Sequence, residues 1–327
     1  MTRYANTGLL AGVLVATVAC GAHAQAQESY PARPITLVIM TGPGTAGDII
    51  ARALVPGLME RLKQPVVIEF RTGASGIIAA DFVAKSAPNG YTLLSTVNTS
   101  TVLQASGRTL PWDLLTDFTH VTKLFTVALA YGANVAMPGA TLKDLVDAVR
   151  ANPGKYTFGS PGNGTPHHLA GELFQQGLGL QMVHVPHKEL SQAYASIVGG
   201  HVDTMTSAVA SYATHMKSGR VKLLAITGPA RLAMIPEVPT FRELGYDFMS
   251  DVDGWYMLSA PAKTPAPIVE RLNREFRAVL NTAEAREALV RFAGAPDTTT
   301  PEEAVAFLKK DIERWSRVIR QGKISVN

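Results

Sequence analysis

Three glycines directly after an apolar segment form the first candidate site in the sequence. The apolar segment 35–40 is followed by Gly42, Gly44 and Gly47, and residues 48–54 then have the pattern of a helix. A glycine-rich loop before a helix presents free backbone N–H groups, and the helix dipole adds to their attraction for an anion. This strand–loop–helix unit therefore predicts a site for an anionic group.

A second unit with the same order occupies residues 156–177, where Ser160, Asn163 and Thr165 add side-chain donors to the loop. Ligands of open α/β sheets bind outside the carboxyl ends of the strands, which is where both loops are expected. If the units belong to different lobes, both helix N-termini face one cleft, which would suit a small carboxylate. Taken alone, each loop is better explained as an ordinary turn in which Asp48 or Thr165 caps a helix.

The main alternative is a dinucleotide-binding oxidoreductase. Gly42, Gly44 and Gly47 match the pattern G-x-G-x-x-G, and Glu69 ends the next strand where a ribose-binding acid is expected. Against this alternative, Asp48 follows the third glycine and places a carboxylate near the expected pyrophosphate. An export signal, described below, would also send the chain to a compartment that is poor in free NAD.

Other catalytic and metal sites receive less support. Residues 159–162 (Gly-Ser-Pro-Gly) do not form the G-x-S-x-G turn of a serine hydrolase. His167, His168, His184 and His187 are close in sequence but match no metal-binding pattern. His168 is expected to order the second loop or to pack in the core. The sequence therefore predicts a protein that is not an enzyme and that holds no metal or cofactor.

The first 26 residues have the features of a signal peptide. Arg3 precedes the apolar run 9–19, and Ala-x-Ala cleavage sites follow it. We therefore expect export to the periplasm. Cys20 is the single cysteine, and lipidation there is not favoured because Thr17 stands where a lipobox has leucine. The net charge of +4 is too weak a surplus to indicate nucleic-acid binding.

Strand and helix patterns alternate along the remaining chain, which predicts an α/β fold with mainly parallel sheets. The helix 48–62 contains Pro56, which we expect to kink it. A capping box at residues 300–303 begins a C-terminal helix, expected on the outside of one lobe with Trp315 in the core. The expected strands are 35–40, 66–70, 91–96, 156–160, 181–185, 202–206 and 221–227.

An ordered set of short motifs resembles the solute-binding proteins of tripartite tricarboxylate transporters, the Bug type. No single motif is specific, but together they cover the chain after the signal peptide in the right order. The motifs lie at residues 30–35, 42–52, 64–69, 71–76, 87–94, 159–164, 168–174, 184–186, 199–203, 235–240, 254–256 and 301–315.

The resemblance implies a two-lobed periplasmic binding protein that closes around a small organic carboxylate and delivers it to a membrane permease. The expected lobes are residues 27–130 with 255–327, and residues 131–254. Asp48 and His168 would support the two loops, and a monomer without a nucleic-acid partner is expected. The residues expected to bind the ligand are Gly42, Pro43, Gly44, Thr45, Ala46, Asn98, Thr99, Ser160, Gly162, Asn163, Gly164, Thr165, His187 and Ser207.

Three departures from the family pattern fall near the expected pocket. Thr45 stands where a second glycine is usual, His187 replaces a tyrosine, and Ser207 replaces an aspartate. The last two changes favour a ligand with net negative charge, because a histidine can carry a proton near neutral pH and an acid is lost. We therefore expect a dicarboxylate or an aromatic acid in preference to a zwitterionic amino acid.

Overall fold

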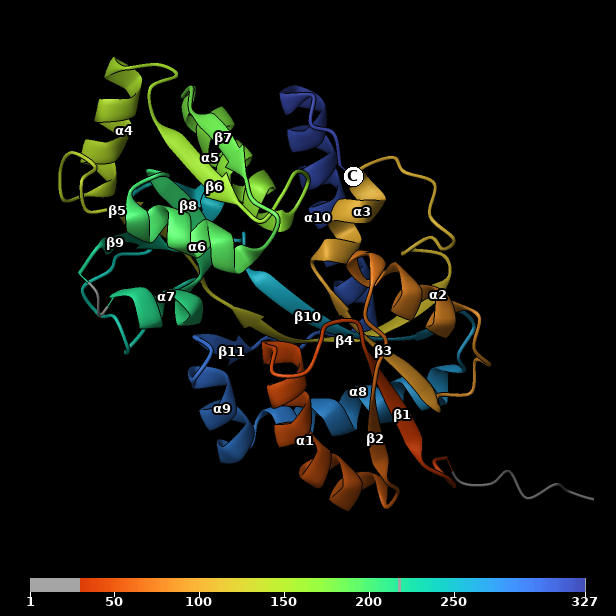
Figure 1. The fold of residues 1–327 in the computed structure, drawn as a ribbon. Coiled ribbons are helices and arrows are strands. Elements are labelled where there is room, and N and C mark those ends of the chain that lie inside the picture. Colours follow the sequence, from red (N-terminus) through yellow and green to blue (C-terminus); the bar gives the residue numbers. More distant parts are fainter. Residues whose placement is uncertain (1–29, 217–218, 327) are drawn as a thin grey trace, which may run out of the picture.

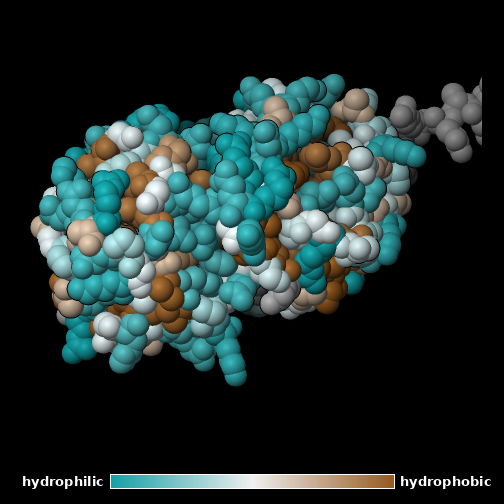
Figure 2. Space-filling model, turned by 90° about the horizontal axis from the view of Figure 1, so that it is seen from above, coloured by the Kyte–Doolittle hydropathy of each residue, from teal (hydrophilic) through white to brown (hydrophobic). Residues whose placement is uncertain are grey.

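Two sheets, each flanked by helices, form the two lobes of the molecule (Figure 1). The computed structural model describes residues 30–216 and 219–326, so the expected signal peptide and Cys20 lie outside it. Within these residues no helix is both long and apolar enough to cross a membrane. On the face shown in Figure 2, hydrophobic residues occur in small separate patches among hydrophilic ones.

The first lobe contains a six-stranded sheet whose side chains alternate between two cores. Leu37 and Ile39 point to one core of this lobe, and Val38 and Met40 point to the opposite core. The sheet order is β11 (Gly294–Pro296), β4 (Phe118–Val127), β10 (Gly254–Pro261), β3 (Thr92–Val97), β1 (Ile35–Ile39) and β2 (Val66–Phe70). The helices are α1 (Ala46–Leu62), α2 (Ile77–Ala84), α3 (Thr99–Ala105), α8 (Ala266–Leu280) and α9 (Ala283–Val290), with a short 3₁₀ turn at Ala74–Gly76.

The second lobe contains a five-stranded sheet with helices on both faces. Phe158 and Leu169 belong to one core, and Met205 and Tyr212 belong to the other. The sheet order is β7 (Val183–Pro186), β6 (Thr157–Ser160), β8 (Thr204–Ala208), β5 (Leu129–Asn134) and β9 (Val221–Ile226). The helices are α4 (Leu142–Ala151), α5 (Pro166–Leu178), α6 (Leu190–Gly199) and α7 (Val209–Met216), with a 3₁₀ turn at Asp247–Met249.

The predicted two-lobed α/β fold is confirmed, and both sheets are mixed, with parallel and antiparallel pairs. β1 pairs in parallel with β2 and β3, and β6 with β7 and β8. β10 runs antiparallel to β3 and β4, and β5 runs antiparallel to β8 and β9. β5 and β10 directly follow the places where the chain crosses between the lobes. They therefore enter their sheets without a crossover helix and run antiparallel to their neighbours.

The C-terminal helix α10 (Pro301–Gly322) contacts both lobes, whereas the sequence predicts that it packs on one. The expected capping box is present, with the side chains of Thr300 and Glu303 bonded to each other's backbone N–H groups. Leu308 packs in the core of the first lobe, and Trp315 packs, as predicted, in the core of the second. Helix α1 continues through Pro56 as one helix.

Buried His120 on β4 makes the stability of the fold depend on pH. Its Nε2 donates to Leu114 O (2.8 Å) and its Nδ1 accepts from Ser259 Oγ (2.9 Å). These two bonds satisfy the one donor and the one acceptor of a neutral imidazole. Burial lowers the pKa of His120 from 6.5 to about 4. The unfolded chain binds this proton more readily, so the stabilisation is present above about pH 6.5 and is lost as the pH falls toward 4.

We expect acidification from about pH 7 to about pH 4.5 to remove about 2.5 kcal/mol of unfolding free energy through His120. Urea unfolding of the wild type and of His120→Asn measures this contribution, and the variant should show a flatter dependence on pH. Exposed His201 supplies the control, since His201→Asn should keep the wild-type dependence. An unchanged slope in His120→Asn would contradict the assignment.

Candidate functional site

The first loop joins the carboxyl end of β1 to the start of α1 and is held by short-range hydrogen bonds. The hydroxyl of Thr45 donates to Gly42 O (2.8 Å) and lies 2.9 Å from the hydroxyl of Thr41. Gly44 has a φ of +80°, and a Cβ there would meet nothing within 4 Å. Pro43 and Gly44 are exposed, while Gly42, Thr45 and Ala46 are partly exposed. The loop is thus a fixed turn whose surface is open.

Asp48 supports this loop, although it does not occupy the N-cap position of α1. Thr45 is the N-cap residue, and Asp48 lies in the first turn with a side chain that is almost fully buried. Its Oδ2 accepts the N–H of Gly44 (2.8 Å), and its Oδ1 pairs with Arg52 Nε (2.6 Å). One of the loop N–H groups is therefore already satisfied by the protein.

The loop approaches the sheet closely at Gly47. A Cβ at this position would lie 2.9 Å from the ring of Tyr256, which stacks on Phe125 with ring centroids 4.3 Å apart. Burial raises the pKa of Tyr256 to about 12, and the backbone of Gly47 hydrogen bonds to it. Gly47 is therefore explained by packing, whatever the loop binds.

Asn98 and Thr99 lie at the same edge of the sheet, between β3 and α3. Because β1 and β3 are adjacent and parallel, their carboxyl ends lie side by side. Both residues are partly exposed. Asn98 O accepts the hydroxyl of Thr101 (2.9 Å), which fixes the start of α3. The structure thus brings this predicted pair to the same edge as the first loop.

The second loop joins β6 to α5 and is anchored at both ends. Fully buried Ser160 has its Oγ 2.7 Å from His184 Nε2 and accepts the N–H of Gly162 (3.1 Å). The side chain of Thr165 caps α5 by accepting the N–H of His168 (3.3 Å). Asn163 is exposed between these anchors.

Gly164 lies beneath the C-terminal segment of the chain. Its φ is +69°, and a Cβ there would lie 2.7 Å from Cα of Val326. Its N–H donates to Nδ1 of His168 (2.9 Å). Gly164 is therefore buried, and of the loop glycines Gly162 is the more accessible.

Two stacked histidines lie under the second loop. The rings of His168 and His184 are parallel, with centroids 3.7 Å apart. Because His168 Nδ1 accepts from Gly164, its Nε2 carries the proton and faces Glu172 Oε1 at 3.5 Å. Burial, with a smaller contribution from His168, lowers the pKa of His184 to about 4. His184 therefore lies beneath the second loop together with His168, although no pattern in the sequence distinguished it.

The structure places His187 beside the second loop and Ser207 away from its surface. The backbone N–H of His187 donates to Ser160 O (2.9 Å). The ring nitrogen Nδ1 of His187 is buried, and the described residues offer it no hydrogen-bond partner. Ser207 is fully buried and accepts the hydroxyl of Tyr194 on α6 (2.7 Å). The neighbouring residue, buried Thr206, has a hydroxyl that the described residues leave without a partner.

The two loops come from different lobes and lie on the sides that face each other. In Figure 1, the loop before α1 lies on the side of the first lobe nearest the second, and β6 points toward the first lobe. Each loop leads into the N-terminus of a helix of more than ten residues. This arrangement aims backbone N–H groups and two helix dipoles at the space between the lobes.

The dinucleotide alternative finds no support in the geometry of the first loop. The carboxylate of Asp48 already accepts the N–H of Gly44, where a pyrophosphate would need a donor. Glu69 pairs with Arg71 at 2.6 Å. Among residues 30–216 and 219–326, no group of three or more histidines, cysteines or acids is placed to hold a metal ion.

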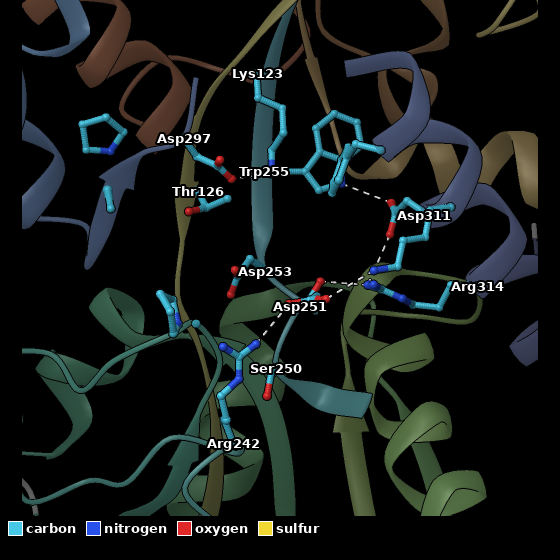
Figure 3. Close-up of a pocket in the computed structure, with 16 residues that line it drawn as sticks. Lys123, Thr126, Arg242, Ser250, Asp251, Asp253, Trp255, Asp297, Asp311 and Arg314 are labelled. Carbon is cyan, nitrogen blue, oxygen red and sulfur yellow. Dashed lines mark hydrogen bonds and ion pairs between the residues drawn. The ribbon is translucent and has the colours of Figure 1, made fainter. Parts of the chain in front are cut away.

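A separate cavity of about 430 Å³ lies at the junction of the two lobes and α10 (Figure 3). None of the residues predicted to bind the ligand lines it. Its lining includes Lys123 and Asp297 from the first lobe, Arg242 and Asp251 from the second, and Arg314 from α10.

Comparisons with known proteins identify similar chains along almost the whole sequence. Residues 50–324 match the family model described as "Tripartite tricarboxylate transporter family receptor". Protein BugT of Bordetella pertussis is 34% identical over 322 residues, covering 96% of this chain and 97% of BugT.

Two solved structures from Rhodopseudomonas palustris contain carboxylate ligands. Rpa4515 with adipate has a TM-score of 0.75 and 28% identity, covering 90% of this chain and 99% of that one. MatC with bound malate has a TM-score of 0.71 and 28% identity, covering 89% of this chain and all of that one. The similarity therefore covers both lobes.

Proposed function

Because the chain belongs to the tripartite tricarboxylate transporter receptor family, we propose that it captures a small organic carboxylate between its lobes and passes it to a membrane permease. It is a periplasmic solute-binding receptor and not an enzyme. The observation that carries the carboxylate assignment is the pair of glycine loops at facing helix N-termini.

A dicarboxylate is the ligand class that the site supports best. Helix N-termini in opposite lobes offer one donor group for each end of a dicarboxylate. The relatives with adipate and with malate bind molecules of this class. Buried His187 Nδ1 offers a further polar contact beside the second loop. An aromatic acid is the alternative, with one carboxylate at the first loop.

The remaining assignments are proposals of the same kind. The lobes comprise residues 27–130 with 255–327, and residues 131–254, and the signal peptide is cleaved near residue 26. The receptor acts as a monomer, and the face drawn in Figure 2 carries only small hydrophobic patches. The ligand contacts are residues 42–46, Asn98, Thr99, residues 160–165 and His187. Ser207 joins them only if its bond to Tyr194 opens.

Titration calorimetry of the purified receptor with adipate, malate, benzoate, glutamate and NAD tests the function. We expect one-to-one binding of a dicarboxylate, with about 2.7 kcal/mol of added stability at about a hundred times its Kd. NAD should give no heat and no stabilisation. Binding of NAD, or chemical turnover of a bound acid, would contradict the proposal. Tight binding of benzoate alone would reassign the ligand class.

A further inference from the structure

Hydrogen bonds at Thr227 join two of the places where the chain passes between the lobes. Thr227 directly follows β9, and its backbone N–H donates to the carbonyl of Leu129 at the start of β5 (2.8 Å). Its hydroxyl oxygen accepts the N–H of Leu129 (2.9 Å) and donates its proton to Oδ1 of Asp253, which directly precedes β10. A rotation of the lobes must pass through these segments, so Asp253 lies at the hinge.

The carboxyl group of Asp253 faces the cavity between the lobes (Figure 3). Lys123 on β4 also lines this cavity, but its ammonium group is ion-paired with Asp297. The hydroxyl of Thr227 is therefore the direct hydrogen-bond donor to Asp253 in this arrangement. One hydrogen bond replaces only part of the hydration that the charged carboxylate loses on burial, so the charged form is disfavoured.

Helix α10 borders the cavity and holds the segment before Asp253. Nη1 of Arg314 donates to the backbone carbonyl of Asp251 (2.8 Å), and Lys310 Nζ lies 3.5 Å from its carboxylate. Arg242 of the second lobe approaches the same carboxylate at 3.9 Å. These contacts join both lobes around the cavity, and a change in the angle between the lobes must alter them.

We propose that Asp253 is a proton-sensitive hinge residue, whose carboxyl group sets the balance between this arrangement of the lobes and arrangements in which the same group is more exposed to water. The proposal concerns the motion of the receptor and does not depend on which ligand the loops bind. It gives the hinge a role in ligand capture that is separate from the glycine loops.

The surroundings of Asp253 fix the direction of the effect. Burial raises the pKa of Asp253 from 3.8 to about 6, the Thr227 hydroxyl and Lys123 lower it in part, and Asp251 and Asp297 raise it. In an arrangement that exposes the carboxyl group, its pKa returns toward its ordinary value. The present arrangement is therefore favoured below about pH 6, and the arrangement that exposes Asp253 further gains as the pH rises through this value. The other charged groups that line the cavity are Arg242, Lys310, Asp311 and Arg314.

Distance measurements between spin labels on the two lobes test the proposal. Cys20 is the only cysteine and lies within the signal peptide proposed to be cleaved, so Glu60→Cys on α1 and Ala151→Cys on α4 can be labelled in the processed receptor. Both label positions are exposed. Without ligand, we expect the ratio of the two lobe arrangements to change by up to about tenfold between about pH 5 and about pH 7.5.

In Asp253→Asn, which keeps an oxygen for the Thr227 hydroxyl, the distances should be the same at both pH values and should match the wild type at about pH 5. Glu287→Gln, which removes an exposed acid on α9 outside this cavity, should keep the wild-type pH response. A pH response that persists in Asp253→Asn, or its absence in the wild type, would overturn the proposal.

Thr227→Val provides a second test that does not alter Asp253, should Asp253→Asn fail to fold. Loss of the hydroxyl removes a donor that favours the charged carboxylate, so the midpoint of the pH response should move to higher pH. A midpoint that stays in place would also overturn the proposal. Loss of carboxylate binding in calorimetry, with the pH response of the lobes intact, would instead count against the proposed function.

Discussion

Replacing Gly44 with valine should lower the affinity for the carboxylate ligand by about a hundredfold while leaving the receptor folded. Gly44 has a φ of +80°, which a β-branched residue adopts only at a cost of about 1–2 kcal/mol or more. The loop relieves this strain by changing its backbone, and the bond from Gly44 N–H to Asp48 is then lost. Isothermal titration calorimetry with a dicarboxylate measures the change.

Gly154 supplies a matched control for this prediction. It also has a positive φ, +74°, and a Cβ there would also meet nothing within 4 Å. It lies before β6, at the end of the strand opposite Ser160. Gly154→Val should therefore destabilise the fold by a similar amount and leave binding unchanged. Equal losses of affinity in the two variants, or normal binding by Gly44→Val, would place the carboxylate site elsewhere.

The two loop units were predictable because the information for each is local. An apolar run, glycines and a helix start follow one another within a few residues, and β1 with α1 and β6 with α5 lie where the sequence places them. The Thr300 capping box is equally local. Such signals depend on backbone geometry and short-range bonds, so they need no knowledge of the rest of the fold.

The strands that connect the lobes were missed because their partners are distant in sequence. β4 carries His120, Thr122 and Lys123, which are buried, and this breaks the apolar pattern expected of a core strand. Their bonding partners include Ser259 and Thr299, more than a hundred residues away. The polar groups are thus satisfied only in the folded protein, and the mixed sheets follow from these same strands.

The directions of side chains at the site also could not be predicted from the sequence. The predicted strand ended at Thr206, which left Ser207 free to face the cleft. In the structure β8 continues to Ala208, so Ser207 points to α6 and bonds to Tyr194. Because successive side chains of a strand point to opposite faces, the direction of Ser207 depends on whether the strand includes it. The stacking of His184 on His168 likewise follows from the pairing of β6 with β7.

Replacing Asp311 with alanine should lower the unfolding free energy by about 4 kcal/mol, because it removes a buried acceptor that joins α10 to the first lobe. Asp311 is 3% exposed. Its Oδ2 accepts the hydroxyl of Thr101 on α3 (2.7 Å) and the indole N–H of Trp255 on β10 (3.1 Å). Alanine leaves the indole N–H of Trp255 buried without this acceptor, and leaves the Thr101 hydroxyl with the carbonyl of Asn98 alone. It also removes the carboxylate that faces Arg314, at 3.4 Å.

Urea unfolding of three variants separates this hydrogen-bonding role from a general effect of changing α10. Asp311→Asn keeps an oxygen that accepts from Thr101 and Trp255, so its loss should be about half that of Asp311→Ala, since only the charge is missing. Exposed Glu313, two residues along the helix, pairs with Arg317 only at 3.9 Å, and Glu313→Ala should cost less than about 1 kcal/mol. Because α10 also packs in the second lobe through Trp315, the loss in Asp311→Ala should weaken the attachment of both lobes. Equal stabilities of Asp311→Ala and Glu313→Ala would show that the buried carboxylate does not hold α10 in place.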